Sequence, residues 1–406
     1  MLALFKLALR NIGRHKGRTG LTLASIVFGV VALILSGGFI EDTIIETGES
    51  MIHSYSGHLQ VARKGYATYG SQNPDKYLIE EPEKLRQKLA GEQAVDDVLL
   101  RLAFSGLLGN GRTDWAISGE GVEPEREARL GSYITLSAGR QLEAKDAFGM
   151  MIGQGVARAL KIKPGESVTL LVNTAGGAAN ALEFEIVGVF QTFSKDYDAR
   201  AVRIPLAAAQ ELLATPGAHT MVLSLKETRD TDAVAGRLRG GLASAGFELQ
   251  TWVELNEFYT QTVTLYQQQF GFLVVIILIM LLLSVSNTVN MGVFERVSEF
   301  GTMLALGDRS SHVFGLIVTE NVLLGLIGST LGTLLGIALA IQISAVGIPM
   351  PPPPNADLGY TSRILVVPAY IALAFATGLI ATTLASLAPA RRVSRMDIAE
   401  ALRQGI

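Results

Sequence analysis

Apolar and polar positions divide the chain into four long apolar runs and one long segment of mixed composition. The runs cover about residues 19–40, 270–293, 313–343 and 364–388. Each is at least as long as the roughly 20 apolar residues that a helix needs to cross the hydrocarbon core of a bilayer. We therefore predict four transmembrane helices, with the large domain 41–269 between the first two.

Short apolar runs alternate with helical patterns in residues 41–269. Strands are predicted at 58–62, 95–108, 113–119, 220–225 and 247–253, and helices at 81–90 and 230–245. This order, β-α-β-β followed by β-α-β, predicts a ferredoxin-like layer interrupted by an insertion at about 125–216. We expect the insertion to be a mostly-β subdomain, and the polar stretches 41–56 and 256–269 to be helical stalks. The fold class is thus an α+β membrane protein.

A short amphipathic segment, 294–312, follows the second apolar run. Charged residues come first in this segment, at Glu295, Arg296 and Glu299. Apolar side chains then recur at helical spacing, at Phe300, Met303, Leu304 and Leu306, and the glycines Gly301 and Gly307 allow tight turns of the backbone. A helix this short is unstable alone in water, so it must lie against the membrane or a partner protein. A coupling helix for a partner and an ordinary interfacial loop both remain open from these residues alone.

The third run carries a stripe of small residues at Gly328, Gly332 and Gly336. Such a stripe lets another helix approach closely, either within one subunit or between subunits. Glu320, near the cytoplasmic end of this run, is expected to have a structural role, because a carboxylate costs less there than at the bilayer centre. The loop 344–363 is expected to be extended around Pro351–Pro354, whose role the sequence does not assign.

The distribution of basic residues sets the orientation. Lysine and arginine concentrate in an amphipathic helix predicted at 1–18 and in the tail 389–406, whereas the loop 344–363 contains only Arg363. Basic residues favour the cytoplasmic side, so both ends are expected in the cytoplasm and the large domain outside. In a bacterium this places the protein in the inner membrane with its head in the periplasm.

Composition and motifs exclude several kinds of chemistry. Charged residues make up only 17% of the 406 residues, against about 25% in a soluble protein, and the net charge of −3 gives no basic tract for nucleic acid. There is no cysteine. No phosphate-binding G-x-x-x-x-G-K-[ST] loop, nucleophile elbow or H-E-x-x-H pair occurs. His53 and His58 are expected to be surface residues, so we predict no catalytic, cofactor-binding or metal-binding residue and no enzyme activity.

Four stretches, in this order along the chain, resemble a known family. They are ALRNIGRHKGRTGLTLASIVFGV, IGQGVARALKIKPGESVTLL, ERVSEFGTMLALG and PARRVSRMDIAEALR. Together they are similar to ABC transporter permeases of the MacB/FtsX/LolC-LolE superfamily, over essentially the whole chain. The resemblance implies a dimer, with a second copy or a paralogue, and a separate cytoplasmic ABC ATPase that binds ATP and magnesium. It also implies that Glu295, Arg296, Glu299, Gly301 and Gly307 are docking positions for that ATPase.

Without the fused ATPase of MacB, the chain is expected to follow the plan of the LolC/LolE permeases. These use ATP hydrolysis by their partner to extract lipoproteins or other amphiphiles from the inner membrane, transmitting force to a periplasmic head that hands the passenger to an acceptor. One alternative is an FtsX-like scaffold that activates a cell-wall hydrolase. Another is a MacB-like efflux subunit that works with a membrane-fusion protein in a tripartite pump.

Overall fold

The computed structural model describes residues 10, 11, 14, 16–70, 74–174, 176–192, 194–351 and 359–396. Most of the predicted helix 1–18, most of the proline loop and the end of the tail therefore lie outside the described residues. The chain forms two compact units. One, the membrane unit, consists of residues 1–44, 262–349 and 361–406; the other, the head, consists of 45–261 and 350–360.

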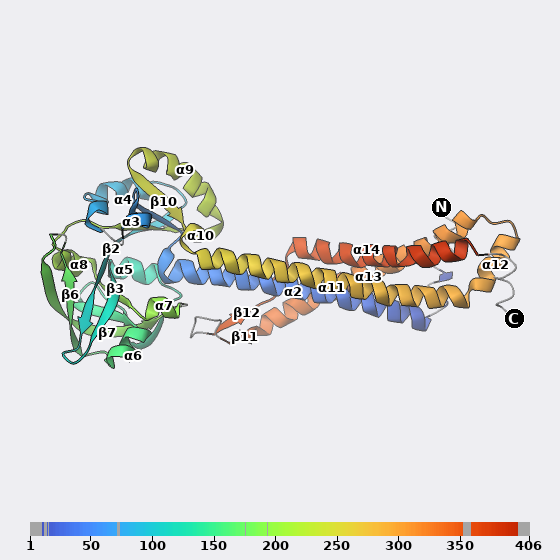
Figure 1. The fold of residues 1–406 in the computed structure, drawn as a ribbon, viewed down its shortest axis with the longest axis horizontal. Helices are drawn as coiled ribbons and strands as arrows, with labels where there is room; N and C mark the ends of the chain where they lie inside the picture. Colours follow the sequence, from blue (N-terminus) through green and yellow to red (C-terminus); the bar gives the residue numbers. More distant parts are fainter. Residues whose placement is uncertain are drawn as a thin grey trace. The chain divides into compact units, whose positions relative to one another are not determined.

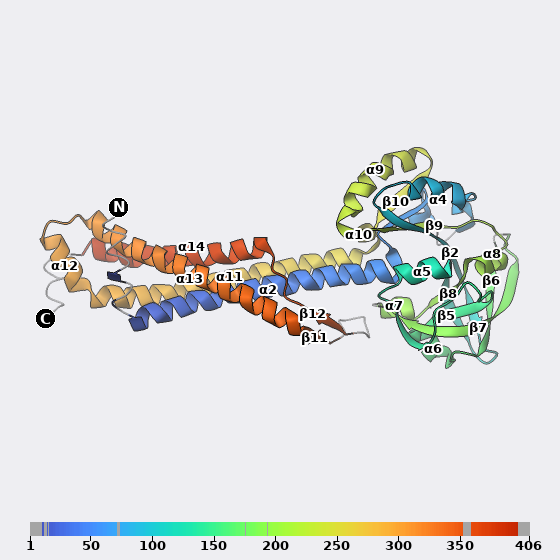
Figure 2. The same cartoon turned by 180° about the vertical axis from the view of Figure 1, so that it is seen from behind.

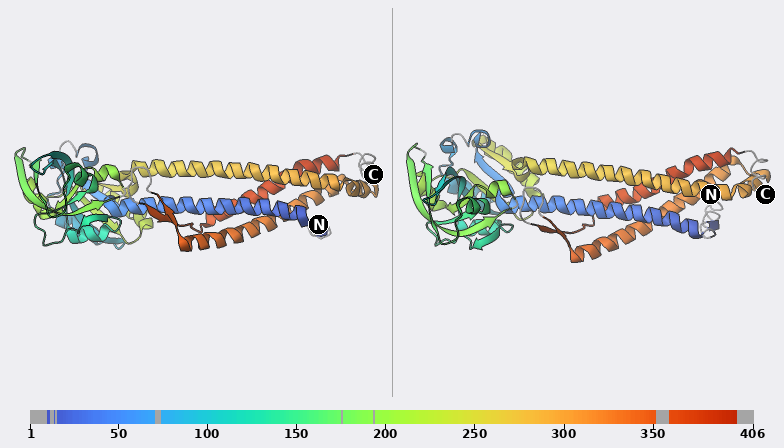
Figure 3. Two further views of the ribbon diagram at one scale, coloured as in Figure 1. Left: turned by 90° about the horizontal axis from the view of Figure 1, so that it is seen from below. Right: turned by 60° about the horizontal axis from the view of Figure 1, so that its bottom comes forward.

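Four helices of the described chain are long and apolar enough to cross a membrane, as predicted. They are α2 (Lys16–Met51), α11 (Glu257–Glu295), α13 (Ser310–Val346) and α14 (Pro368–Ser394). Within the membrane unit they run lengthwise beside one another (Figure 3). The polar stretches predicted as stalks are helical. Helix α11 continues without a break from Glu257 into the second span, whereas α2 ends at Met51 and a π-helix, Ile52–Ser56, follows it.

The glycine stripe of α13 packs against α2. A Cβ atom added to Gly332 would lie only 2.8 Å from Cβ of Val30, and one added to Gly328 would lie 3.0 Å from Cβ of Ile26. Gly336 faces Ile34 one turn further along. Small residues thus let the two helices approach where any side chain would collide, and the stripe serves a contact within one chain.

The fourth span differs from its predicted bounds at both ends. Helix α14 begins at Pro368 and not at residue 364, because proline suits the first helical position and favours an extended residue before it. The predicted stop at Pro389 is wrong: the helix passes through this proline and continues to Ser394. Proline removes a single backbone hydrogen bond, and neighbouring helices and hydroxyl side chains make this tolerable in membrane helices.

The head is built on one mixed sheet of ten strands (Figure 1). Its path runs β10-β1-β9-β2-β3-β8-β5-β7-β4, with β6 paired to β2 and β7. The strands are β1 (Leu59–Arg63), β2 (Val95–Gly109), β3 (Asp114–Val122), β4 (Thr135–Gly139), β5 (Gly149–Gly153), β6 (Ser167–Asn173), β7 (Ala179–Gln191), β8 (Ala201–Pro205), β9 (Thr220–Leu225) and β10 (Phe247–Thr251).

The first four strands of this path form the predicted ferredoxin-like layer. Strands β1, β2, β9 and β10, with helices α4 (Pro82–Ala90) and α9 (Thr231–Ser244), follow one another in the order β-α-β, β-α-β. Both helices pack on one face of these strands (Figure 2), where Leu89, Val234 and Leu242 join strand residues in a buried cluster. The opposite face of these strands is not covered by α4 or α9.

The insertion begins earlier than predicted, and it is not a separate sheet. Strand β3 was assigned to the ferredoxin-like layer, but it pairs in parallel with β8 and so opens the inserted part. Because β2 pairs along its length with β9, β3 and β6, the same strand belongs to both halves of the head. Helices α5 (Pro124–Leu130), α6 (Gln154–Leu160), α7 (Lys195–Asp198) and α8 (Leu206–Leu213) complete this half.

His58 is not the surface residue that the sequence predicts, since only 2% of it is exposed. Its Nδ1 accepts a hydrogen bond from the backbone N–H of Leu225 at 3.1 Å, and its Nε2 lies 3.1 Å from Oγ1 of Thr228. Burial lowers the pKa of His58 from 6.5 to about 4. The side chain is therefore a neutral part of the head core at neutral pH.

This buried histidine should make the protein less stable in acid. Between pH 6.5 and 4 the unfolded state binds a proton at this residue and the folded state does not, so stability falls as pH falls through that window. H58N keeps an acceptor for the Leu225 N–H but cannot titrate. In detergent, we expect the melting temperature of H58N to fall less than that of the parent between pH 6.5 and 4. The exposed control H312N should keep the parental slope; equal slopes for H58N and the parent would contradict the assignment.

Candidate coupling site

The segment after α11 is a helix held between two defined turns. Helix α12 (Val297–Ala305) follows a single non-helical residue, Arg296, at which the backbone leaves α11. At its other end Asp308 N–H donates to the Met303 carbonyl at 3.0 Å, and Gly307 N–H to the Leu304 carbonyl at 3.1 Å. This pair of bonds is the Schellman arrangement, and Gly307 has the left-handed φ of 97° that it requires.

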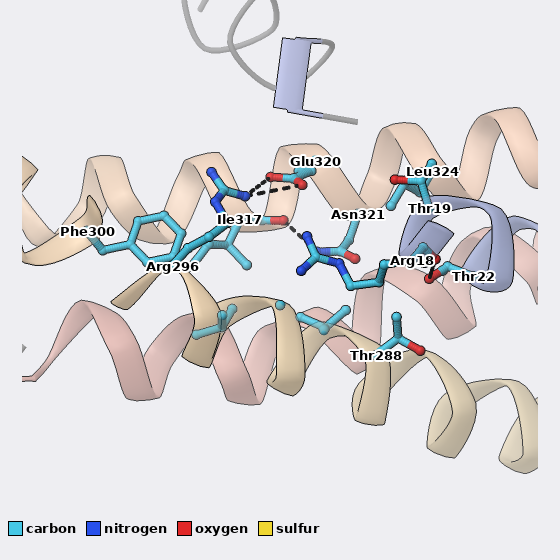
Figure 4. A pocket seen from close by; sticks show the side chains of 13 residues that line it. Arg18, Thr19, Thr22, Thr288, Arg296, Phe300, Ile317, Glu320, Asn321 and Leu324 are labelled. Atoms are coloured by element: carbon cyan, nitrogen blue, oxygen red, sulfur yellow. Dashed lines mark hydrogen bonds and ion pairs between the residues drawn. The ribbon is translucent and has the colours of Figure 1, made fainter. Parts of the chain in front are cut away.

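Arg296 anchors this segment inside the membrane unit. Only 7% of it is exposed. Its Nη1 lies 3.1 Å from Oε2 of Glu320 on α13, and its guanidinium lies 5.1 Å from the centre of the Phe300 ring (Figure 4). Its Nε lies 3.1 Å from Oε2 of Glu299. One cation thus joins the end of α11, the start of α12 and the neighbouring helix. The structural role expected for Glu320 is to neutralise this buried arginine.

Two further ion pairs bind the same segment to the start of the chain. Nη1 of Arg18 lies 3.1 Å from Oε2 of Glu295, and Nη1 of Arg14 lies 3.2 Å from Oε1 of Glu299. Arg18 approaches so closely that a Cβ atom on Gly292 would lie 2.3 Å from its Nη1. Both pairs are partly exposed, so each alone contributes little to stability. The first pair ties the start of α2 to the end of α11, and the second ties Arg14, which precedes α2, to α12.

The predicted docking residues divide into a buried and an exposed group. Arg296, Phe300 and Gly301 are buried in the membrane unit and present no surface to a partner. Met303 and Leu304 are half-buried against the same core. Leu306, in contrast, is 84% exposed. An apolar side chain so exposed, on a segment fixed by buried contacts, is suited to bind a second protein.

The sequence predicts a structural role for Glu320 but not its ion pair with Arg296. It places Arg14 and Arg18 in a basic amphipathic helix and assigns them no partner. Their partners are separated from them by more than 270 positions: Arg18 and Glu295 by 277, Arg14 and Glu299 by 285. The available signal was a cluster of charges at the cytoplasmic ends of two apolar runs, where opposite charges are expected to pair.

The space beside these residues is too small for a ligand. Arg18, Arg296, Glu320 and Asn321 line a cavity of about 30 Å³, roughly the size of one water molecule (Figure 4). Among the described residues, no group of three histidine, aspartate or glutamate side chains could hold a metal ion. The charged side chains of the site hold α12 and α13 to the end of α11.

Along the sequence, the mixed-sheet head lies between the first and second membrane helices, and the short helix α12 lies between the second and third. Residues 19–240 match the family described as MacB-like periplasmic core domain, and residues 271–398 match the FtsX-like permease C-terminal family. The chain belongs to the MacB/FtsX family of ABC transporter permeases. It is a multi-pass protein of the bacterial inner membrane, and the head is its periplasmic domain.

Several known proteins are similar to this chain. The lipoprotein-releasing system transmembrane protein LolE of Haemophilus influenzae is 21% identical over 272 residues, covering 64% of each chain. A macrolide export ATP-binding/permease protein MacB of Hyphomonas neptunium is 23% identical over 98% of this chain and 60% of its own length. The periplasmic region of MacB from Actinobacillus actinomycetemcomitans is 13% identical with a TM-score of 0.36, over 53% of this chain and 97% of that one. The chain spans 55–64% of the length of the first curated relatives.

Proposed function

We propose that this chain is the membrane subunit of an ATP-driven complex in which a cytoplasmic ABC ATPase binds the segment from Glu295 to Arg309. The observation that carries the proposal is the exposed Leu306 on a segment anchored by the buried Arg296–Glu320 pair. A partner that pushes on Leu306 also moves Arg296. Since Arg296 directly follows α11, and α11 is one unbroken helix from Glu257, the displacement passes along that helix.

We further propose that this motion drives the head to release lipoproteins or other amphiphiles from the membrane to a periplasmic acceptor. Support comes from the similarity to LolE, which is named for lipoprotein release. The complex would contain two permease copies, or this chain and a paralogue. Apolar side chains on α11 such as Phe272, Ile276 and Leu283 are 61–70% exposed, which suits contact with lipid or with the second permease.

Export of a soluble compound is a second candidate function. It is favoured by the MacB relative, which aligns over 98% of this chain, whereas the LolE relative aligns over 64%. In that case a membrane-fusion protein would replace the lipoprotein acceptor. Incubating the reconstituted complex with ATP separates the two: release of a lipidated passenger from the bilayer supports the first function, and ATP-driven loss of a soluble compound supports the second.

The docking proposal is tested at Leu306. We expect L306E to abolish co-purification with the ATPase and ATP-driven release, because it places a charge at the centre of an apolar contact. The matched variant L306M keeps an apolar side chain of similar size and should retain both. As a surface change, L306E should leave the free energy of unfolding within about 0.5 kcal/mol. Wild-type ATPase binding by L306E would exclude Leu306 as the docking contact.

A further inference from the structure

The head contains a cleft of about 990 Å³. It is lined from the ferredoxin-like strands by Gln60 on β1, Thr220 on β9 and Gln250 on β10. Strands β2 and β3 add Ser105 and Ser118, which lie directly opposite each other in the sheet. A cleft of this size is at the upper end of those that bind small ligands and has room for a short peptide segment.

The side chains that line the cleft are suited to a peptide backbone. They include three amides and four aliphatic hydroxyls, which can both donate and accept hydrogen bonds, as a peptide group also requires. Phe104 and Tyr66 add aromatic surface, and Tyr66 stacks on His219 with ring centres 5.4 Å apart. Small side chains at Ala62 and Ala103 leave the sheet surface open for a chain lying across it.

The charge of the cleft restricts its ligand further. Three carboxylates line it, Asp75, Glu254 and Glu257, and no lysine or arginine does so among the described residues. Glu254 is neutralised by Arg239 at 2.9 Å, which leaves Asp75 and Glu257 without an ion-pair partner in the described chain. This surface repels phosphate and other anions and attracts a basic group.

A buried histidine, His219, lies in the wall of the same cleft. Burial lowers the pKa of His219, so its ring is neutral at neutral pH. Nδ1 accepts the backbone N–H of Ala103 at 3.1 Å, which places the ring hydrogen on Nε2. Backbone groups of Pro74 and Ala103 hold the ring in the cleft wall, where it stacks on Tyr66.

We infer that this cleft binds an extended, uncharged-to-basic peptide segment of the passenger. The inference rests on the proposed function and deepens it, because a lipoprotein presents a peptide chain beyond its lipid anchor. The head would then hold the polar part of the passenger while α11 transmits the ATPase movement. A nucleotide, an anionic lipid headgroup and an acidic peptide are excluded by the lack of a lining cation.

The test uses the full-length protein in nanodiscs of neutral lipid and two fluorescein-labelled peptides. Both peptides alternate serine and glycine with one charged residue type, lysine in one and glutamate in the other. We expect the lysine peptide to bind at least tenfold more tightly in an anisotropy titration. The double variant D75N/E257Q should lose most of this preference, whereas the control E211Q, outside the cleft, should keep it. Equal affinity for the two peptides would overturn the charge argument.

A blocking variant tests the place of binding. S105W puts a large side chain into the cleft from an exposed strand position, where aromatic residues are well tolerated. We expect it to weaken binding of the lysine peptide at least tenfold, whereas T169W, at an exposed position of β6 outside the cleft, should leave it unchanged. Unchanged affinity in S105W would overturn the assignment. If S105W lost peptide binding but kept ATP-driven release, the cleft would have no role in transport. The proposed ATPase contact is tested separately, by ATPase binding in L306E.

Discussion

Replacing Arg296 by methionine is expected to lower the free energy of unfolding by about 3–5 kcal/mol. The change leaves Glu320 buried without a counter-charge, and burial without a partner is the most costly state of a carboxylate. The exposed Arg309 in the same segment provides the matched control. R309M should change stability by no more than about 0.5 kcal/mol. Thermal unfolding of the purified full-length protein in detergent measures both.

The double variant R296M/E320M separates the cost of an orphaned charge from the value of the pair. When both partners are replaced by apolar side chains of similar size, the double variant should recover to near parental stability, since a buried ion pair gains little over good apolar packing. It should nevertheless lose ATP-driven release, because α12 is no longer tied by charge to α13. If R296M were as stable as the parent, or the double variant no better than R296M, the assigned role would be wrong.

The second large effect is expected at Gly332. A leucine there would place Cβ 2.8 Å from Cβ of Val30 and 3.2 Å from Cα of Val27, so α2 and α13 would have to separate. Overpacking of this kind costs about 1–3 kcal/mol or more. The matched control is Gly315 on the same helix, where nothing lies within 4 Å of an added Cβ. G332L should lower the melting temperature and the yield of folded protein, and G315L should do neither.

A disulfide test distinguishes contact within one chain from contact between two. The chain contains no cysteine, so I34C/G336C is the sole pair introduced. An added Cβ on Gly336 lies 3.4 Å from Cβ of Ile34, close to the 3.5–4.5 Å of a disulfide. Mild oxidation should therefore give a cross-linked monomer on a denaturing gel. A cross-linked dimer would instead assign the glycine stripe to a subunit interface.

The pattern of apolar and polar residues was sufficient to predict the helices and strands of the head, but not which strands pair. The helix starting at Pro82 and the strands β1, β2, β9 and β10 were predicted close to their observed bounds, because proline, glycine turns and apolar periodicity are local signals. The prediction was wrong on β3. Its sequence is compatible with either half of the head, and its parallel pairing with β8 depends on residues about 80 positions away.

In the coupling site, too, the sequence predicted the helix but not which of its side chains are buried. Helical spacing identified Phe300, Met303, Leu304 and Leu306 as one apolar set, yet in the structure Phe300 is buried and Leu306 is exposed. Periodicity gives the angle of a side chain around its helix axis. Leu306 lies beyond the last residue of α12, Ala305, so helical spacing does not place it on the face of Phe300.

By itself, therefore, the sequence determined the four membrane helices, their orientation, the α+β head and the position of the cytoplasmic segment. These follow from transfer of apolar side chains out of water and from local backbone preferences, which act over neighbouring residues. Tertiary structure alone decided that Arg296 is an internal anchor, that Arg14 and Arg18 bind the coupling segment, and that one strand joins both halves of the head. Each depends on contacts between residues distant along the chain, where the closeness of two charges or strands is set by the packing of whole helices and sheets.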